Sequence, residues 1–144
     1  MIKRVLVTGA FDLVHVGHIT FLEKVRALGD QLYVGLSTDE TIQARKGAGR
    51  PIYPYEDRRK ILYALRVVDT VYPIHGLNEE EIVKSTKELV AKIKPHTIVG
   101  GWERTADAFM IPIADRNSWL TYCSIYCEVT HTTEIINKIR QIKD

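Results

Sequence analysis

The chain has few cysteines, little net charge and no long hydrophobic run. Its 144 residues include only two cysteines, Cys123 and Cys127, which are too few for a disulfide framework. The formal net charge of +2 gives no reason to expect nucleic-acid binding as the main activity. The longest apolar runs are much shorter than a membrane-spanning helix requires. Composition therefore argues against a disulfide scaffold, a membrane protein and a charge-driven nucleic-acid binder.

The first residues also lack the features of a secretory signal. They read MIKRVLVTG, with no apolar core followed by a small-residue cleavage site. We therefore expect a cytoplasmic protein in a reducing setting, without a membrane partner. Hydrophobic residues make up 45% of the chain, which is enough to build a core. At this length we expect residues 1–144 to form a single domain.

Apolar runs and helical patterns alternate along the chain, with no internal repeat. The first helix begins near Val16 or Gly17, with Gly29 as its expected C-cap, and Asn78 is the expected N-cap of a later helix. The alternation predicts an α/β fold, a parallel sheet of about five strands with helices on both faces. The predicted strands cover 2–7, 31–36, 70–74, 97–99 and 122–129. The helical pattern of the first predicted helix ends at residue 28, and the other predicted helices cover 41–46, 56–67, 79–93 and 132–142.

Three glycine-containing segments each follow a predicted strand. They are the turn GAFD at 9–12, the segment KGAGRPIYP at 46–54, and the pair Gly100 and Gly101. In parallel sheets, ligands bind outside the carboxyl ends of the strands, where the strand order reverses. We therefore expect these three segments to gather at one rim of the sheet and to form the binding site.

Two histidines, His15 and His18, stand where the first strand is followed by a helix. A helix N-terminus offers unpaired N–H groups and a positive dipole end, and residues three apart share one helix face. Both rings can therefore meet one anion, while Gly9 gives the backbone room to approach it. Two alternatives remain from the residues alone: ordinary histidines, one capping and one packed, or a metal pair supported only by Asp12.

The segment GAFDLVHVGH resembles the G-x-F-D-x-x-H-x-G-H signature of the cytidylyltransferase-like nucleotidyltransferases. The similarity continues through LGDQLYVGLSTDE, KGAGRPIYPYEDRRKILYALRVVD, KPHTIVGG and HTTEIINKIR, and is weakest over 102–128. The family includes glycerol-3-phosphate cytidylyltransferase, heptose-phosphate adenylyltransferase and an archaeal FAD synthase. The resemblance implies a Rossmann-like fold and a biosynthetic homodimeric enzyme. Such an enzyme transfers a nucleotidyl group from ATP or CTP to a sugar or polyol phosphate and releases pyrophosphate, with Mg²⁺ arriving on the nucleoside triphosphate.

The same resemblance implies roles for individual residues. His15, His18 and Lys46 are the implied catalytic residues, which contact the phosphates and stabilise the transition state. Lys46 is expected on a mobile loop that closes over the triphosphate. Arg58 matches the arginine of the family's P-x-E-x-R segment. The implied nucleotide-binding residues are Thr8, Gly9, Ala10, Phe11, Gly17, Arg58, Gly100, His131, Thr132 and Thr133.

Several positions depart from the family pattern and leave the substrates open. Tyr126 stands where the glycerol-phosphate enzymes carry an arginine, and His131 stands where the family usually has serine. The segment KGAGRPIYP resembles the heptose-phosphate adenylyltransferases, whereas Gly101 and Trp102 resemble the cytidylyltransferases. We expect ATP to be favoured slightly over CTP. An FMN adenylyltransferase, a nucleotide-binding module without chemistry, and a structural domain with packed histidines are the alternatives.

The remaining polar residues have plainer interpretations. Asp39 follows a strand and is read as a helix N-cap. Asp12 is read as holding its turn in place, with the holding of a histidine as the alternative. Cys123 and Cys127 are read as buried thiols on one strand face. Together with His131 they could instead bind a metal, which is the less favoured interpretation.

Overall fold

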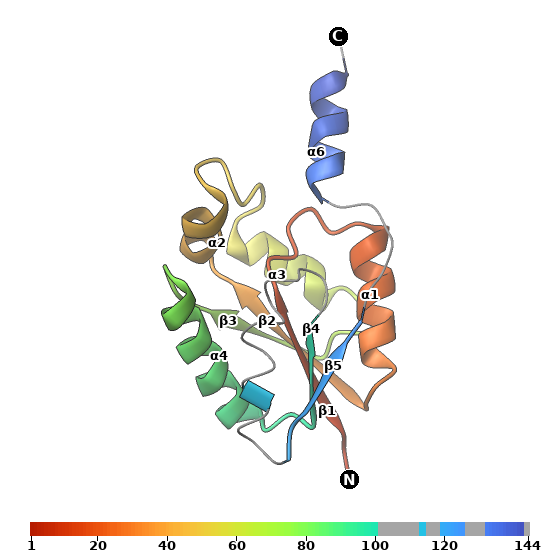
Figure 1. Ribbon diagram of the computed structural model, residues 1–144. Coiled ribbons are helices and arrows are strands. Elements are labelled where there is room, and N and C mark those ends of the chain that lie inside the picture. The colour runs from red at the N-terminus through yellow and green to blue at the C-terminus, as the bar shows by residue number, and fades with distance from the viewer. Residues whose placement is uncertain (101–112, 115–118, 126–131, 143–144) are drawn as a thin grey trace.

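The computed structural model describes residues 1–100, 113–114, 119–125 and 132–142, and shows one parallel sheet with strand order β3-β2-β1-β4-β5 (Figure 1). The strands are β1 (Arg4–Gly9), β2 (Gln31–Ser37), β3 (Thr70–Ile74), β4 (Thr97–Gly100) and β5 (Thr121–Ser124). The described helices are α1 (Val16–Arg26), α2 (Asp39–Lys46), α3 (Tyr55–Tyr63), α4 (Glu79–Ile93) and α6 (Thr132–Gln141). The α/β, Rossmann-like fold expected from the sequence is confirmed.

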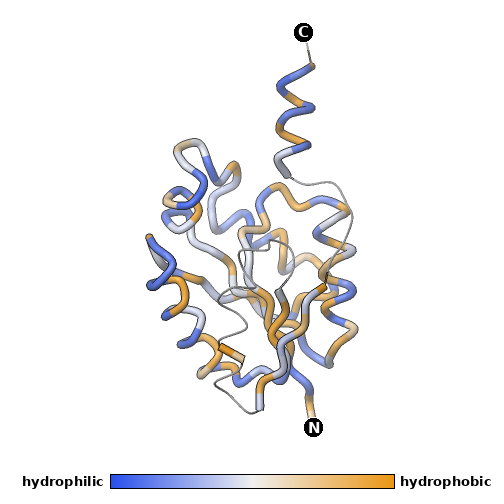
Figure 2. The backbone as a smooth tube through the Cα atoms, viewed as in Figure 1, coloured by the Kyte–Doolittle hydropathy of each residue, from blue (hydrophilic) through white to orange (hydrophobic). Residues whose placement is uncertain are grey.

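Helices cover both faces of the sheet because successive side chains of β1 point to opposite sides. Val5 and Val7 belong to a buried cluster with Phe21 of α1 and Leu62 of α3. Leu6 belongs to a second cluster, which contains the apolar side of α4. Figure 2 shows the hydrophobic residues concentrated along the strands between these helices. The sheet is therefore buried on both faces, as a parallel sheet requires.

The strand order reverses beside β1. This strand pairs with β2 on one side, where Thr8 is opposite Gly35, and with β4 on the other, where Val7 is opposite Val99. The chain runs outward from β1 to β2 and β3, then returns to place β4 and β5 on the opposite side. Ligands of such sheets bind at this reversal, outside the carboxyl ends of the strands. For this chain that place is next to Gly9 and Gly100.

Gly29 is not the C-cap that the sequence suggested. Helix α1 ends at Arg26, and its C-cap is Ala27 in an ordinary right-handed conformation. A Cβ atom at Gly29 would lie 2.7 Å from the carbonyl oxygen of Lys3. The glycine is therefore needed for close contact with the segment that leads into β1, rather than for a left-handed turn.

Other boundaries also differ from the sequence-based expectation. Helix α2 begins at Asp39 because Thr38 is its N-cap, so Asp39 is not the cap. Helix α3 ends at Tyr63 rather than near residue 67, and the chain continues in turns closed by i to i−3 hydrogen bonds. Strand β5 ends at Ser124, whereas a strand over 122–129 was expected, and residues 126–131 lie outside the described part. None of the helices that the structure describes is long and apolar enough to cross a membrane.

Candidate active site

The turn after β1 has an unusual backbone for its sequence. Phe11 and Leu13 both adopt left-handed conformations, with φ of 45° and 50°, although neither is glycine. Such conformations cost free energy, and they cluster at ligand-binding sites. The Phe11 ring folds back over Gly9, where a Cβ atom would lie only 2.9 Å from it. The open space expected at Gly9 is therefore filled by the chain's own ring, which shapes the floor of the site.

His15 and His18 cap the N-terminus of α1. His15 is the N-cap residue, and its Nδ1 atom accepts a hydrogen bond from the Gly17 N–H at 3.1 Å. His18 Nδ1 accepts from the His15 N–H at 3.3 Å, so the two rings form a reciprocal capping box. A neutral imidazole that accepts at Nδ1 carries its proton at Nε2. The capping bonds therefore select the tautomer that offers Nε2–H as a donor.

The two rings lie together but are not equivalent. Their centroids are 4.0 Å apart, and His18 lies 5.6 Å from the Phe11 ring. His18 is only 3% exposed and lines the cavity at the rim, whereas His15 is partly exposed and does not line it. The sequence left capping and anion binding as alternatives. The structure shows that both rings cap the helix.

Asp12 connects the turn to a distant segment. Its side chain is 2% exposed and accepts hydrogen bonds from the N–H groups of Ile52, at 2.6 Å, and Tyr53, at 3.0 Å. Its backbone oxygen accepts a hydrogen bond from the Thr132 hydroxyl at 3.0 Å. The sequence-based interpretation, that Asp12 holds its own turn, is therefore wrong. The side chain fastens the 46–54 segment to the turn, and the backbone fastens the start of α6.

Arg58 lies beneath this turn and is fully buried. Its Nε donates to the Tyr53 oxygen at 2.9 Å, and its Nη1 donates at 2.8 Å to the oxygens of Ala10 and Ser37. Its Nη2 completes an ion pair with Asp39 at 2.7 Å. These contacts join the ends of β1 and β2 to the start of α3. Arg58 does not line the cavity, so its contacts place it in the framework that supports the site.

Asp39 and Tyr55 complete this framework. The Asp39 carboxylate also accepts from the Tyr55 N–H at 3.2 Å, and the Arg58 guanidinium carbon lies 5.7 Å from the Tyr55 ring centre. Burial raises the pKa of the Tyr55 phenol above its usual value, and the opposing effect of Arg59 is smaller. The phenol therefore stays neutral at physiological pH beside the buried guanidinium.

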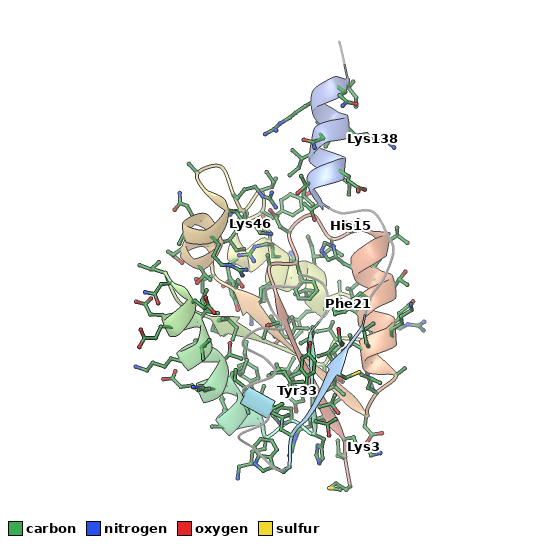
Figure 3. The ribbon with its side chains drawn as sticks, in the orientation of Figure 1. Lys3, His15, Phe21, Tyr33, Lys46 and Lys138 are labelled. Carbon is green, nitrogen blue, oxygen red and sulfur yellow. The ribbon has the colours of Figure 1, made fainter. Side chains whose placement is uncertain are left out.

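The rim holds a cavity that collects most of the expected site residues. Gly17 and His15 do not line it, Arg58 lies beneath it, and His131 lies outside the described residues. Figure 3 shows His15 and Lys46 at the same end of the molecule, on the α1 side and the α2 side. The expected residues that line the cavity are Thr8, Gly9, Ala10, Phe11, His18, Lys46, Gly100, Thr132 and Thr133.

Lys46 does not lie in a loop. It is the last residue of α2, and Gly47 follows it as the C-cap. A cation in the last turn interacts favourably with the negative end of the helix dipole. The lysine therefore stands on a regular element, and the expected placement on a mobile loop is wrong.

Four polar residues that line the cavity were not predicted as site residues: Asp12, Ser37, Arg45 and Arg50. Arg50 was within reach of sequence reasoning, because it lies in the KGAGRPIYP segment that was expected at the rim. Arg45 precedes Lys46 and carries no signal of its own. Trp102, Tyr126 and Cys127, considered earlier, lie outside the described residues.

The described residues contain no group of three or more His, Cys, Asp or Glu side chains placed to hold a metal ion. Asp12, the carboxylate nearest the histidines in the sequence, has both oxygens occupied by backbone N–H groups. The donors at this rim are N–H groups, hydroxyls and cationic side chains, which suit phosphate oxygens. The chemistry of this rim therefore suits an anion better than a metal ion bound by protein carboxylates.

Comparison with known proteins agrees with this arrangement. Residues 6–142 match the model of the cytidylyltransferase-like family. A bifunctional protein HldE from Methylobacillus flagellatus is 38% identical over 115 residues, which is 80% of this chain and 22% of that protein. An FAD synthase from Pyrococcus abyssi is 44% identical over 104 residues, which is 72% of this chain and 66% of that protein. The chain thus spans between 19% and 28% of the length of the HldE proteins compared with it.

A solved structure supports the same assignment. The lipopolysaccharide core biosynthesis protein from Thermoplasma volcanium has a TM-score of 0.68 and 27% identity, covering 91% of this chain and all of that one. A rim of hydroxyl and cationic groups at a strand reversal, with two histidines capping the helix after β1, accompanies the sequence match over nearly the whole length. The chain belongs to the cytidylyltransferase-like family.

Proposed function

We propose that this protein is a nucleotidyltransferase that joins the nucleotidyl group of ATP or CTP to a phosphorylated sugar or polyol and releases pyrophosphate. The observation that carries the proposal is the capped α1 N-terminus, where His18 lines a cavity shared with Lys46 and Thr132. Helix N-termini and cationic side chains bind phosphate, and this cavity supplies both from opposite walls. The sugar-phosphate class is supported by the HldE relatives.

In the proposed reaction, an oxygen of the acceptor phosphate attacks the α-phosphorus of the triphosphate, and the bond from that phosphorus to the bridging oxygen breaks. The electron pair leaves with pyrophosphate, so no covalent enzyme intermediate is required. His18 offers a hydrogen-bond donor to the phosphates from the cavity wall, His15 holds the His18 ring through the capping box, and the Lys46 ammonium adds positive charge from α2. The protein mainly positions the reactants and neutralises the charge that grows on the leaving group.

We also propose that Mg²⁺ enters with the nucleotide. The supporting reason is charge: a triphosphate and an acceptor phosphate must meet, and a divalent ion on the phosphate oxygens lowers their repulsion. His18 and Lys46 would then hold the phosphate oxygens that the ion leaves exposed.

The decisive experiment is a matrix of four nucleoside triphosphates against phosphorylated acceptors, read by pyrophosphate release. The acceptors are a heptose 1-phosphate, glycerol 3-phosphate and FMN. We expect activity with a sugar phosphate, with ATP ahead of CTP. Nucleotide binding without pyrophosphate release from any acceptor would indicate a binding module without chemistry. Absence of both would leave a structural domain, and either result would refute the proposal.

A second candidate is an FMN adenylyltransferase. The specific observation behind it is the 44% identity to the Pyrococcus abyssi FAD synthase, which exceeds the identity to the HldE proteins cited above. Both candidates use the same nucleotide site and differ in the acceptor. Rates with FMN that exceed those with every sugar phosphate would replace the first candidate by the second.

We further propose that the protein is a homodimer. Helix α6 contains no buried residue and stands away from the sheet, while Ile139 and Ile142 are 58% and 70% exposed (Figure 1). A ten-residue helix is marginal in water without tertiary packing. A second copy that covers this side would stabilise it. Light scattering should give twice the chain mass for the native protein and the chain mass for Ile139→Glu. The matched control is Lys138→Glu on the same helix, and a monomeric native protein would refute the proposal.

A further inference from the structure

Arg50 is a cation of the cavity that the family resemblance did not single out. It lies between α2 and α3, and it lines the same cavity as His18 and Lys46. Its side chain is 18% exposed, and its Nε lies 3.5 Å from Asp12 Oδ2. Among the residues that the structure describes, this buried Nε has no hydrogen-bond partner. The guanidinium is therefore held close to the cavity by charge attraction rather than by a hydrogen-bonded pair.

The neighbouring contacts explain why Asp12 does not complete a two-pronged pair with Arg50. Both oxygens of Asp12 already accept backbone hydrogen bonds, from Ile52 and Tyr53. These bonds fix the peptide that directly follows Arg50 and Pro51. Asp12 thus positions the arginine through the backbone and leaves most of its donor capacity, five N–H groups in all, for another anion.

Arg58 offers an internal comparison, because it is in the same segment of chain. Its guanidinium is fully buried and donates to three carbonyl oxygens and to Asp39. Such an arginine has its donors committed to the protein. Arg50 has the opposite character, since it is partly exposed and lines the cavity. If one of these two arginines binds a ligand phosphate, the geometry selects Arg50.

We infer that Arg50 binds the phosphate of the acceptor substrate. His18 of α1 and residues 9–11 line one side of the cavity, which we assign to the triphosphate. Arg50 and Lys46 come from the other segment, which follows β2. The reaction must bring a second phosphate toward the first, and a planar guanidinium can hold two oxygens of that phosphate at once. This inference rests on the proposed function, because it assigns the second substrate of that reaction.

The test uses inorganic phosphate as the probe, with the full chain saturated by the unreactive analogue α,β-methylene-ATP and Mg²⁺. Calorimetry measures the Kd of phosphate for the native protein, Arg50→Gln and Arg50→Lys. The control is Arg59→Gln, which removes an exposed arginine paired with Glu56 outside the cavity. We expect Arg50→Gln to weaken phosphate binding about tenfold or more and Arg50→Lys to restore it only partly. The affinity for the analogue should stay unchanged in all variants.

Three results would overturn the inference: no measurable phosphate binding by the native protein, unchanged phosphate affinity in Arg50→Gln, or an equal loss of analogue affinity in that variant. Full restoration by Arg50→Lys would also overturn it, because charge alone would then suffice. Melting temperatures without ligand separate these results from misfolding, and Arg50→Lys keeps the positive charge beside Asp12. A failure of the proposed function looks different: no acceptor in the substrate matrix releases pyrophosphate, whatever Arg50→Gln does to phosphate binding.

Discussion

Replacing Arg58 by methionine should destabilise the protein without removing any group from the cavity. Methionine keeps much of the length of the side chain but none of its donors. The substitution leaves the carbonyl oxygens of Ala10, Ser37 and Tyr53 without the guanidinium that they now accept from. An unsatisfied buried acceptor costs about 1–3 kcal/mol, and such costs are not additive.

The ion pair contributes less than its short distance suggests. Asp39 is 41% exposed, so water can solvate its carboxylate once the arginine is gone. We therefore attribute most of the loss to the three carbonyls, and expect about 3–5 kcal/mol in total, because costs of about 1–3 kcal/mol each are not fully additive. For a domain of this size that lowers Tm by about 10 °C or more.

The measurement is urea unfolding followed by circular dichroism, with Arg59→Met as the control. Arg59 is 44% exposed and its partner Glu56 is 76% exposed, so its loss should change the free energy of unfolding by less than about 0.5 kcal/mol. An Arg58→Met protein with the native unfolding midpoint would refute the reasoning. If such a protein also lost nucleotide binding, Arg58 would be a ligand contact, as the family resemblance implied.

Three further predictions concern the proposed reaction. His18→Ala should lower turnover about a hundredfold or more, and should cost about 1 kcal/mol of stability because the His15 N–H loses its acceptor; native turnover would remove the catalytic role. Lys46→Ala should lower kcat and kcat/KM together if the lysine acts in the transition state, whereas a rise in KM alone would restrict it to ground-state binding. Excess chelator should abolish pyrophosphate release, and restoration by Mg²⁺ checks the cause.

The sequence predicted the parallel sheet and the rim because the alternation of strands and helices and the glycines after the strands are local patterns that tertiary contacts leave unchanged. The run around Val5 and Val7 is apolar on both faces, and Asn78 caps α4 as expected. The resemblance also named His18, Lys46 and Thr132 as site residues, and all three line one cavity. His18 and Thr132 lie in the first turns of helices and Lys46 lies in the last turn of one, where capping and turn residues make the boundary recognisable.

The side-chain connections were beyond the reach of the sequence. Nothing local indicates that Asp12 accepts from the backbone forty residues later, or that Arg58 is buried while Arg50 faces the cavity. Arg50 lies between α2 and α3, Arg58 lies near the start of α3, and both carry the same charge. Which one is buried depends on carbonyl oxygens that β1 and β2 expose only after the sheet has formed. The left-handed Phe11 is likewise imposed by packing, because phenylalanine has no intrinsic preference for that conformation.

The position of β1 has a consequence for how the chain reaches its native state. Among these 144 residues, the first strand in the sequence is the middle strand of the sheet, and its second neighbour does not begin until Thr97. The bond from Thr132 to Asp12 then closes a loop of 120 residues. Contacts of such long range form slowly, since the chain loses much entropy before they return any stabilisation. During synthesis, the edge of β1 that pairs with β4 therefore stays unpaired until residues 97–100 have been made. Partly made chains are accordingly the species most prone to associate through that edge.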